Sequence, residues 1–184
     1  MNKISRLWAL VITISILALG AVVANSNSPS SAEGGCAGRA YVTNTVADTV
    51  SVINTATNLV VGSPIAVGIN PNGVAITPNG AFAYVTNVNS GTVSVIDTAT
   101  NAVVGSAIPV GGAPRDIAIT PDGTKAYVTN RNADTVSVIN TATNAVVGSP
   151  ITVGDLPFGI AICPAAVVPP TTPTDPAVVL KFTG

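Results

Sequence analysis

The sequence that decides the fold is the tetrapeptide Tyr-Val-Thr-Asn, which stands at residues 41–44, 84–87 and 127–130. After four intervening residues, each copy is followed by Thr-Val-Ser-Val-Ile, at residues 49–53, 92–96 and 135–139. Successive copies are 43 residues apart, and no insertion disturbs the register. A repeat of this length means that one supersecondary unit is used several times, so the structure of the unit determines the fold.

Each unit contains four short runs that are rich in β-branched residues, seen in one copy at residues 116–120, 126–129, 135–139 and 145–153. These runs predict strands, and Pro-Asp-Gly at 121–123 predicts a tight hairpin between the first two. Four antiparallel strands in a period of about 40–45 residues are typical of one β-propeller blade. A helical solenoid would need a hydrophobic period of about 3.6 residues, which the units lack.

The chain resembles the YVTN-repeat β-propeller family, which is found in surface-layer and other secreted or envelope proteins. The shared motifs are Tyr-Val-Thr-Asn, Thr-Val-Ser-Val-Ile-Asp, Pro-Val-Gly and Ile-Ala-Ile-Thr-Pro-Asp-Gly, and they cover about residues 40–164. The resemblance implies a propeller fold and a location in the cell envelope. It implies little about catalysis, because propellers host many unrelated functions.

The predicted fold is all-β, a partial propeller of three four-stranded blades of 43 residues each. Propellers close with about four to eight blades, so three blades leave the ring incomplete. The strand phase predicts that the first blade, residues 40–67, lacks its inner strand and that residues 158–163 form an inner strand without a blade. The predicted domains are a signal segment (1–24), a flexible N-terminal stretch (25–39), the repeats (40–163) and a Pro- and Thr-rich tail (164–184). By sequence period, the repeat units are 41–83, 84–126 and 127–169.

The N-terminal residues predict export. Lys3 and Arg6 precede an uncharged stretch over residues 7–24 that ends in small residues, which is the order found in cleaved signal peptides. The stretch has 18 residues, enough for a membrane-spanning helix, so an uncleaved anchor is the alternative. We therefore expect an extracytoplasmic protein, secreted or attached to the envelope, that meets a membrane only through this segment if it is retained.

Two cysteines stand at the two predicted open ends. Cys163 is one period after Thr120, and Cys36 is two periods before Asp122, so both correspond to positions that flank the same tight turn. We predict a disulfide between them, within one chain or between chains, and the alternative is two separate thiols. Because three blades cannot easily span a circle, the preferred partner is a second copy, in a C2 dimer of six blades. Other envelope proteins, or the missing part of a longer propeller, are the alternatives.

The composition excludes several classes of function. The 184 residues include 7 Lys and Arg, 8 Asp and Glu, and no His. So little positive charge argues against nucleic-acid binding. Without His, the usual general base, imidazole zinc sites and Ser-His-Asp triads are missing, and no phosphate- or calcium-binding motif is present. We expect neither a cofactor nor a metal.

Candidate binding residues are those that differ between the copies. The loops that enter the inner strands and the loops that join the second and third strands share one rim, and they carry Asp48, Asn89, Arg115, Asp116, Arg131, Asp134, Asp155 and Phe158. The simpler interpretation is a set of solvated loop tips, and the sharper one is a polar mouth that binds a ligand. The Tyr residues of the repeat are expected in the blade core, with their hydroxyls hydrogen-bonded.

The expected function is a non-enzymatic structural or interaction role at the cell surface, by self-assembly, with no catalytic residue. The alternative is part of a propeller enzyme, lactonase-like or quinone-dependent, that uses Asp116 and Arg115 at the channel mouth. The preference depends on the inner strands, where residues 74–76, 117–119 and 160–162 are apolar and nearly interchangeable. An enzyme should place polar, non-repeating residues on these strands.

Overall fold

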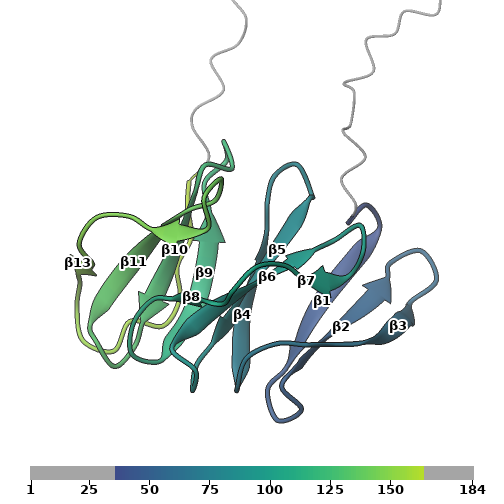
Figure 1. Cartoon of the computed structure of the whole chain (residues 1–184), viewed down its shortest axis with the longest axis horizontal. Coiled ribbons are helices and arrows are strands. Elements are labelled where there is room, and N and C mark those ends of the chain that lie inside the picture. The colour runs from purple at the N-terminus through teal and green to yellow at the C-terminus, as the bar shows by residue number, and fades with distance from the viewer. Residues whose placement is uncertain (1–35, 164–184) are drawn as a thin grey trace, which may run out of the picture. The chain divides into compact units, whose positions relative to one another are not determined.

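A computed structural model describes residues 36–163, which form three antiparallel sheets side by side (Figure 1). The first sheet contains β1 (Arg39–Asn44), β2 (Thr49–Asn54) and β3 (Leu59–Ala66). The second contains β4 (Pro71–Ile76), β5 (Phe82–Asn87), β6 (Thr92–Asp97), β7 (Ala102–Val103) and β8 (Ile108–Pro109). The third contains β9 (Pro114–Ile119), β10 (Lys125–Asn130), β11 (Thr135–Asn140), β12 (Ala145–Val146) and β13 (Ile151–Thr152). These described residues contain strands and turns without a helix, and the all-β prediction is confirmed.

The strand order identifies each sheet as a propeller blade. The second sheet runs β4-β5-β6-β7, with β8 also on β6, and the third runs β9-β10-β11-β12, with β13 also on β11. The first sheet runs β1-β2-β3, and β1 corresponds to the second strand of the other two blades. The inner strands β4 and β9 pack against each other, and β1 packs against β4. The predicted partial propeller is confirmed, including the first blade that lacks its inner strand.

The tyrosine of the Tyr-Val-Thr-Asn motif joins each blade to the next. The Tyr41 hydroxyl donates to Oδ1 of Asn101 over 2.9 Å, and the Tyr84 hydroxyl donates to Oδ1 of Asn144 over 2.6 Å. In both pairs the asparagine lies 60 residues further along the chain. The prediction of core tyrosines with bonded hydroxyls is confirmed at these two positions, and burial raises the pKa of the Tyr84 phenol above its ordinary value.

The threonine of the motif makes a second inter-blade contact. Thr43 of β1 donates its hydroxyl to the carbonyl of Asn72 in β4 over 2.8 Å, and Thr86 of β5 donates to the carbonyl of Arg115 in β9 over 2.9 Å. Each acceptor lies 29 residues further on, in the inner strand of the next blade. The motif therefore recurs because its side chains set the spacing between blades as well as the pairing within them.

Apolar side chains fill the two spaces between the three blades. One core lies between the first and second blades and contains Tyr41, Val50, Val52, Ile65, Ala83, Val85 and Ile96. The other lies between the second and third blades and contains Tyr84, Val93, Val95, Ile108, Ile117, Ala126, Val128 and Ile139. Both faces of the second blade are thus covered, whereas the first and third blades each have one covered face.

Two strand predictions need correction. The fourth run of the third unit, predicted as continuous over 145–153, consists of two short strands, β12 and β13, which pair with opposite ends of β11. Residues 158–163, predicted as an inner strand, are extended but have no strand assignment. An inner strand pairs with the second strand of its own blade, and none of residues 36–163 supplies that second strand for them.

Cys36 and Cys163 are both free thiols in the described chain, so the alternative of a disulfide within one chain is not formed, and pairing with a second copy stays a prediction. Cys36 packs against the core between the first two blades, and Cys163 is exposed beyond the third blade. Three blades form an open arc, so the two ends of the described chain do not meet.

Candidate functional site

The segment that follows β13 takes the place of a further inner strand beside β9. Thr129 of β10 donates its hydroxyl to the carbonyl of Phe158 over 3.0 Å, which repeats the contact of Thr86 with Arg115 one period earlier. The N–H of Leu156 is held by a loop of the third blade. Residues 156–160 therefore continue the repeat geometry and lie along β9.

Asp116 of β9 lies between the neighbouring inner strands. Its Oδ1 accepts a hydrogen bond from the N–H of Ile117 over 2.9 Å, and its Oδ2 accepts one from the N–H of Ile160 over 3.1 Å. A Cβ placed on Gly73 would lie 3.1 Å from Oδ1, and one placed on Gly159 would lie 3.9 Å from Oδ2. The carboxylate thus occupies room left by two glycines. Each of its oxygens has one partner here and can accept another donor.

Arg115 places a positive charge at the same end of β9. Its guanidinium carbon lies 5.6 Å from the centroid of the Phe158 ring, a cation–π arrangement. Its Nε is buried and has no hydrogen-bond partner among residues 36–163. Arg115 and Asp116 form no ion pair with each other within residues 36–163, and both contact the segment that follows β13, at Phe158 and Ile160 respectively.

Two of the other predicted rim residues are loop anchors. Oδ1 of Asp48 accepts the N–H of Asn70 over 2.8 Å, and Oδ1 of Asp134 accepts the N–H of Leu156 over 2.8 Å. Both aspartates have positive φ, 55° and 52°, and Gly91 with 65° holds the equivalent position in the second blade. A short polar side chain tolerates this backbone conformation and then bonds the next loop.

The remaining rim residues do not join a cluster. Asn89 and Arg131 contact neighbouring loops only through their backbone N–H groups. These donate to the carbonyl of Ile69 over 3.2 Å and to the carbonyl of Ala113 over 3.1 Å, respectively. Asp155 is exposed in the loop after β13. The candidate site is therefore the group formed by Arg115, Asp116 and Phe158.

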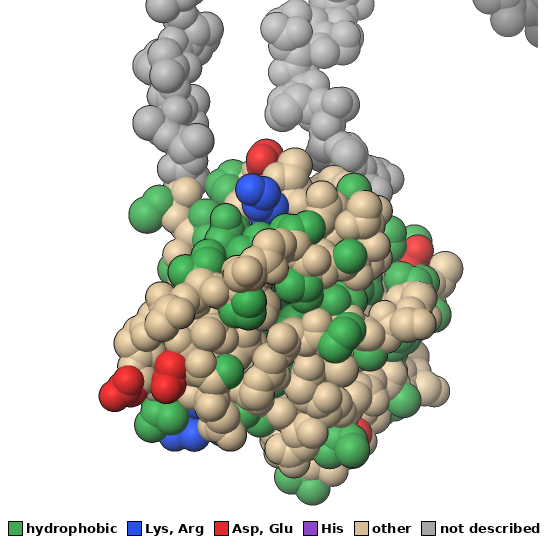
Figure 2. Space-filling model, turned by 60° about the vertical axis from the view of Figure 1, so that its left-hand side comes forward, with side chains coloured by type: hydrophobic (Ala, Val, Ile, Leu, Met, Phe, Trp, Pro, Cys, Tyr) green, Lys and Arg blue, Asp and Glu red, His purple; other side chains and the backbone are tan. Residues whose placement is uncertain are grey.

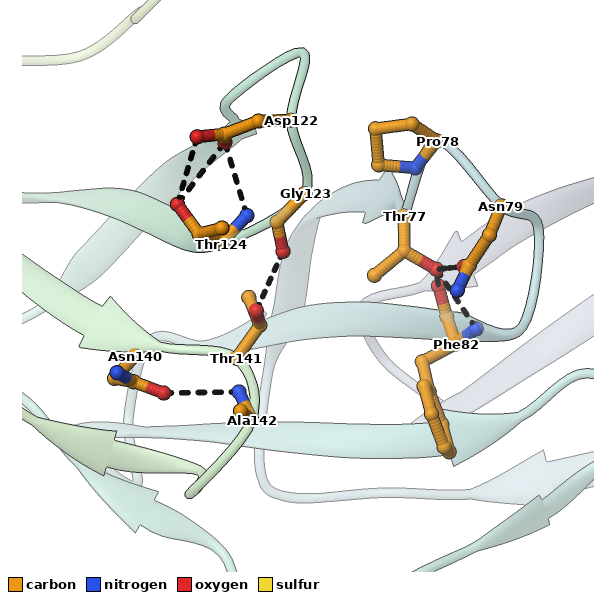
Figure 3. Close-up of a pocket in the computed structure, with 10 residues that line it drawn as sticks. All are labelled: Thr77, Pro78, Asn79, Phe82, Asp122, Gly123, Thr124, Asn140, Thr141 and Ala142. Atoms are coloured by element: carbon orange, nitrogen blue, oxygen red, sulfur yellow. Dashed lines mark hydrogen bonds between the residues drawn. The ribbon is translucent and has the colours of Figure 1, made fainter.

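A separate pocket of about 530 Å³ opens at the opposite ends of the blades, between the β4–β5 and β9–β10 turns (Figure 3). Its polar groups are already bonded to one another. Thr77 donates to Oδ1 of Asn79 over 2.7 Å, and Asp122 accepts the N–H of Thr124 over 3.0 Å. The hydroxyl of Thr120, followed by the N–H and hydroxyl of Thr124, holds the pKa of Asp122 below its usual value. Such a carboxylate is a weaker base than an ordinary aspartate, which makes this pocket the less suitable place for general base catalysis.

Reasoning from the sequence missed the backbone donor at Ile160 and the clamp from Thr129. The signal that could have found them is the 43-residue period itself, because Phe158 is one period after Arg115 and Gly159 is one period after Asp116. Within residues 36–163, no three His, Cys, Asp or Glu side chains lie close enough together to bind a metal. This part of the chain also has no helix long and apolar enough to cross a membrane.

The fold and the site define a β-propeller with a carboxylate and a guanidinium on one inner strand. Residues 37–148 match the family described as "Lactonase, 7-bladed beta-propeller", and the chain belongs to that family. A search of curated proteins gave no match.

Solved structures with similar blades include hydrazine synthase of Kuenenia stuttgartiensis, with 32% identity and a TM-score of 0.62 over 68% of this chain and 35% of that one. Two others are putative 6-phosphogluconolactonases. The one from Bacteroides fragilis has 22% identity and a TM-score of 0.56 over 65% of this chain and 37% of its own. The one from Bacteroides uniformis has 19% identity and a TM-score of 0.59 over 68% of this chain and 41% of its own. This chain therefore spans well under half the length of these structures.

The expectation of a non-enzymatic protein is contradicted, because the family that matches residues 37–148 is described as a lactonase. The inner positions are uniform only at residues 74–76, 117–119 and 160–162. At the preceding positions the three copies read Asn72-Gly73, Arg115-Asp116 and Phe158-Gly159, which differ from one another, and only the middle pair is charged. These are the non-repeating residues that an enzyme is expected to place there.

Proposed function

We propose that this chain forms part of a lactone hydrolase whose reaction takes place where Arg115, Asp116 and Phe158 meet. The observation that carries the proposal is that β9 places a carboxylate where the neighbouring inner strands have Gly73 and Gly159. Positions that repeat serve the fold in every blade. The other two copies have glycine at this position, so the blade fold does not require a charge there. The charge of Asp116 therefore indicates a function.

The chemistry follows from the two charges. Asp116 acts as a general base and removes a proton from a water molecule while the water oxygen bonds to the lactone carbonyl carbon. The ring C–O ester bond then breaks, and the departing alkoxide takes the proton from Asp116 to give an open hydroxy acid. The guanidinium of Arg115, stacked on Phe158, stabilises the negative charge that forms on the carbonyl oxygen.

The family and the neighbours support a sugar lactone as the substrate class. Two of the similar structures carry the description putative 6-phosphogluconolactonase. Arg115 also suits an anionic substituent, because its five N–H donors match the oxygens of a phosphate or carboxylate and its Nε is unpaired within residues 36–163.

Hydrolysis of a panel of δ-lactones, with and without a phosphate group, by the purified full chain tests the proposal through acid release in a pH-stat. We expect Asp116→Asn to lower kcat by about a hundredfold to ten-thousandfold. The control is Asp122→Asn, which removes an exposed carboxylate at the other end of the blade and should keep the wild-type rate. A wild-type chain that hydrolyses no lactone would refute the function, and an unaffected Asp116→Asn variant would refute the role of Asp116.

We also propose that the protein is exported and that, among lactonase-type propellers, it belongs with the YVTN-repeat proteins of the cell envelope. Residues 1–24 support export, and the three Tyr-Val-Thr-Asn motifs support the subgroup. The mass of the protein recovered outside the cytoplasm tests export, since removal of residues 1–24 shortens the chain by a known amount, whereas a retained anchor leaves the full mass.

A further inference from the structure

The first and third blades each have an uncovered face, and the two faces are complementary. On the third blade, Ile151 is 47% exposed, whereas the equivalent Ile65 and Ile108 are 8% and 3% exposed. On the first blade, Val42 is 42% exposed, whereas the equivalent Val85 and Val128 are fully buried. In the view that turns the third-blade side forward, apolar side chains are spread over the surface and charged ones stand near its margins (Figure 2).

We propose that a second copy of this chain covers these faces, and that residues 160–163 of each copy become the inner strand of the other copy's first blade. The tail is already placed for this role, because Leu156 and Phe158 make the contacts of an inner-strand segment. The first blade lacks that strand. The C-terminal end of the described chain thus offers an inner strand, and the first blade at the other end lacks one. The proposal does not rest on the lactonase activity.

The repeat fixes the register of the donated strand. In the second blade, Ala75 of the inner strand is opposite Tyr84, and in the third, Ala118 is opposite Tyr127. One further period places Ala161 opposite the partner's Tyr41. The flanking isoleucines then meet residues 40 and 42 of the partner, in the same way that their equivalents pair in the other blades.

The tyrosine contact between blades continues across the same junction. Tyr127 is half-buried, and its hydroxyl has no partner among residues 36–163, although its equivalents donate to Asn101 and Asn144. The remaining equivalent asparagine is Asn58 in the first blade. It has a φ of 56°, close to 54° and 52° for the other two, so the partner's Asn58 is already in the conformation that accepts the hydroxyl.

The glycines of the loops that enter the inner strands give a steric marker for the junction. A Cβ on Gly68 or Gly111 would lie 2.6 Å from Cγ of Asn87 or Asn130 in the following blade. The equivalent Gly154 has no atom within 4 Å of such a Cβ. In the proposed dimer, Gly154 faces the partner's Asn44.

The two cysteines take the places of two side chains that touch in complete blades. Cys163 is equivalent to Thr77, and Cys36 is equivalent to Asn79, whose Oδ1 is 2.7 Å from the Thr77 hydroxyl oxygen. We therefore expect a disulfide between Cys163 and the partner's Cys36. With a small-molecule disulfide as oxidant, the two protein thiols lose two protons and two electrons, and the oxidant is reduced to two thiols.

Two copies give six blades, within the range of about four to eight in which propellers close. The family has seven, so closure by two copies opens the angle between adjacent blades from about 51° to about 60°. Both junctions of such a ring are identical, as C2 symmetry requires.

Oxidation with glutathione disulfide tests the pairing on the full chain. We expect light scattering to give twice the chain mass and non-reducing electrophoresis to give a linked dimer. Cys36→Ser and Cys163→Ser should each abolish the link, and their mixture should restore it, because one mixed junction contains both cysteines. A disulfide within single chains, an open-ended ladder of oligomers, or a monomer with two free thiols would overturn the proposal.

Gly154→Ala tests the register without touching a thiol. We expect the variant to fold as the wild type does, by circular dichroism, because its methyl group meets open space in a single chain. In the dimer the methyl group collides with the partner's Asn44, and we expect an association about tenfold to a hundredfold weaker. Unchanged association of a folded Gly154→Ala variant would contradict the proposed register.

Discussion

The hydrogen bond between Tyr84 and Asn144 offers a direct test of what joins the blades. Tyr84→Phe removes the hydroxyl that donates to Asn144 over 2.6 Å and leaves the buried ring in place. Asn144 lies in an exposed turn, so its oxygen regains water in the variant. The loss of free energy of unfolding should therefore be about 1 kcal/mol, and not the larger cost of an orphaned buried group. For a domain of this size, that is a fall of roughly 3–6 °C in Tm.

Tyr127→Phe is the matched control, because this hydroxyl has no partner within residues 36–163. In dilute, reduced protein we expect Tyr127→Phe to change the free energy of unfolding by less than about 0.5 kcal/mol. Urea unfolding followed by circular dichroism measures both variants. Equal losses would refute the assignment of the stabilisation to the inter-blade hydrogen bond. If the dimer forms, Tyr127→Phe becomes destabilising as the protein concentration rises.

The effect of Tyr84→Phe on stability should also depend on pH. Burial raises the pKa of the Tyr84 phenol, so the folded chain holds this proton more tightly than the unfolded chain does. The contribution is complete below the unfolded pKa of about 10 and is lost as pH rises through the folded pKa. The stability difference between wild type and Tyr84→Phe should therefore shrink in alkaline solution. A difference that stays constant up to pH 12 would contradict this linkage.

Two further substitutions test the spacing between blades. Thr86→Val leaves the N–H of Gly73 and the carbonyl of Arg115 without the hydroxyl that now bonds both, over 2.8 and 2.9 Å, and should cost about 2–4 kcal/mol in urea unfolding. Gly111→Ala drives a methyl group to 2.6 Å from Cγ of the buried Asn130 and should cost about 1–3 kcal/mol in the same assay. A loss below about 0.5 kcal/mol in either variant would show that the loops and inner strands yield more easily than the repeat geometry indicates.

The sequence predicted the fold because the repeat samples the same unit three times. A single unit would leave the strand assignment ambiguous, but a constant 43-residue period with turn residues at fixed offsets selects a blade. The burial of Tyr41 and Tyr84 could also be predicted. Their acceptors could not, because a partner 60 residues away lies in another blade and depends on how two sheets face each other.

The candidate site was only partly predictable, since sequence comparison finds differing residues without showing what they contact. Asp48 and Asp134 differ from Gly91 because a left-handed turn accepts either residue, and in the structure the aspartates bond the next loop. Arg115 and Asp116 were singled out, but as neighbours of each other. They form no ion pair within residues 36–163, and instead contact Phe158 and Ile160, 43 and 44 residues further on.

The position of Asp116 shows how a repeat can build a site that no single blade contains. Its carboxylate needs the N–H of Ile160 from the next inner segment and the empty space above Gly73 in the previous blade. A Cβ on Gly73 would come within 2.8 Å of the Arg115 carbonyl oxygen and 2.9 Å of the Asp116 Cα, so even alanine would push β4 away from β9. The glycine thus sets the approach of two strands, and that approach holds the carboxylate in place. A change in blade spacing should therefore alter the position of Asp116 before it unfolds any blade.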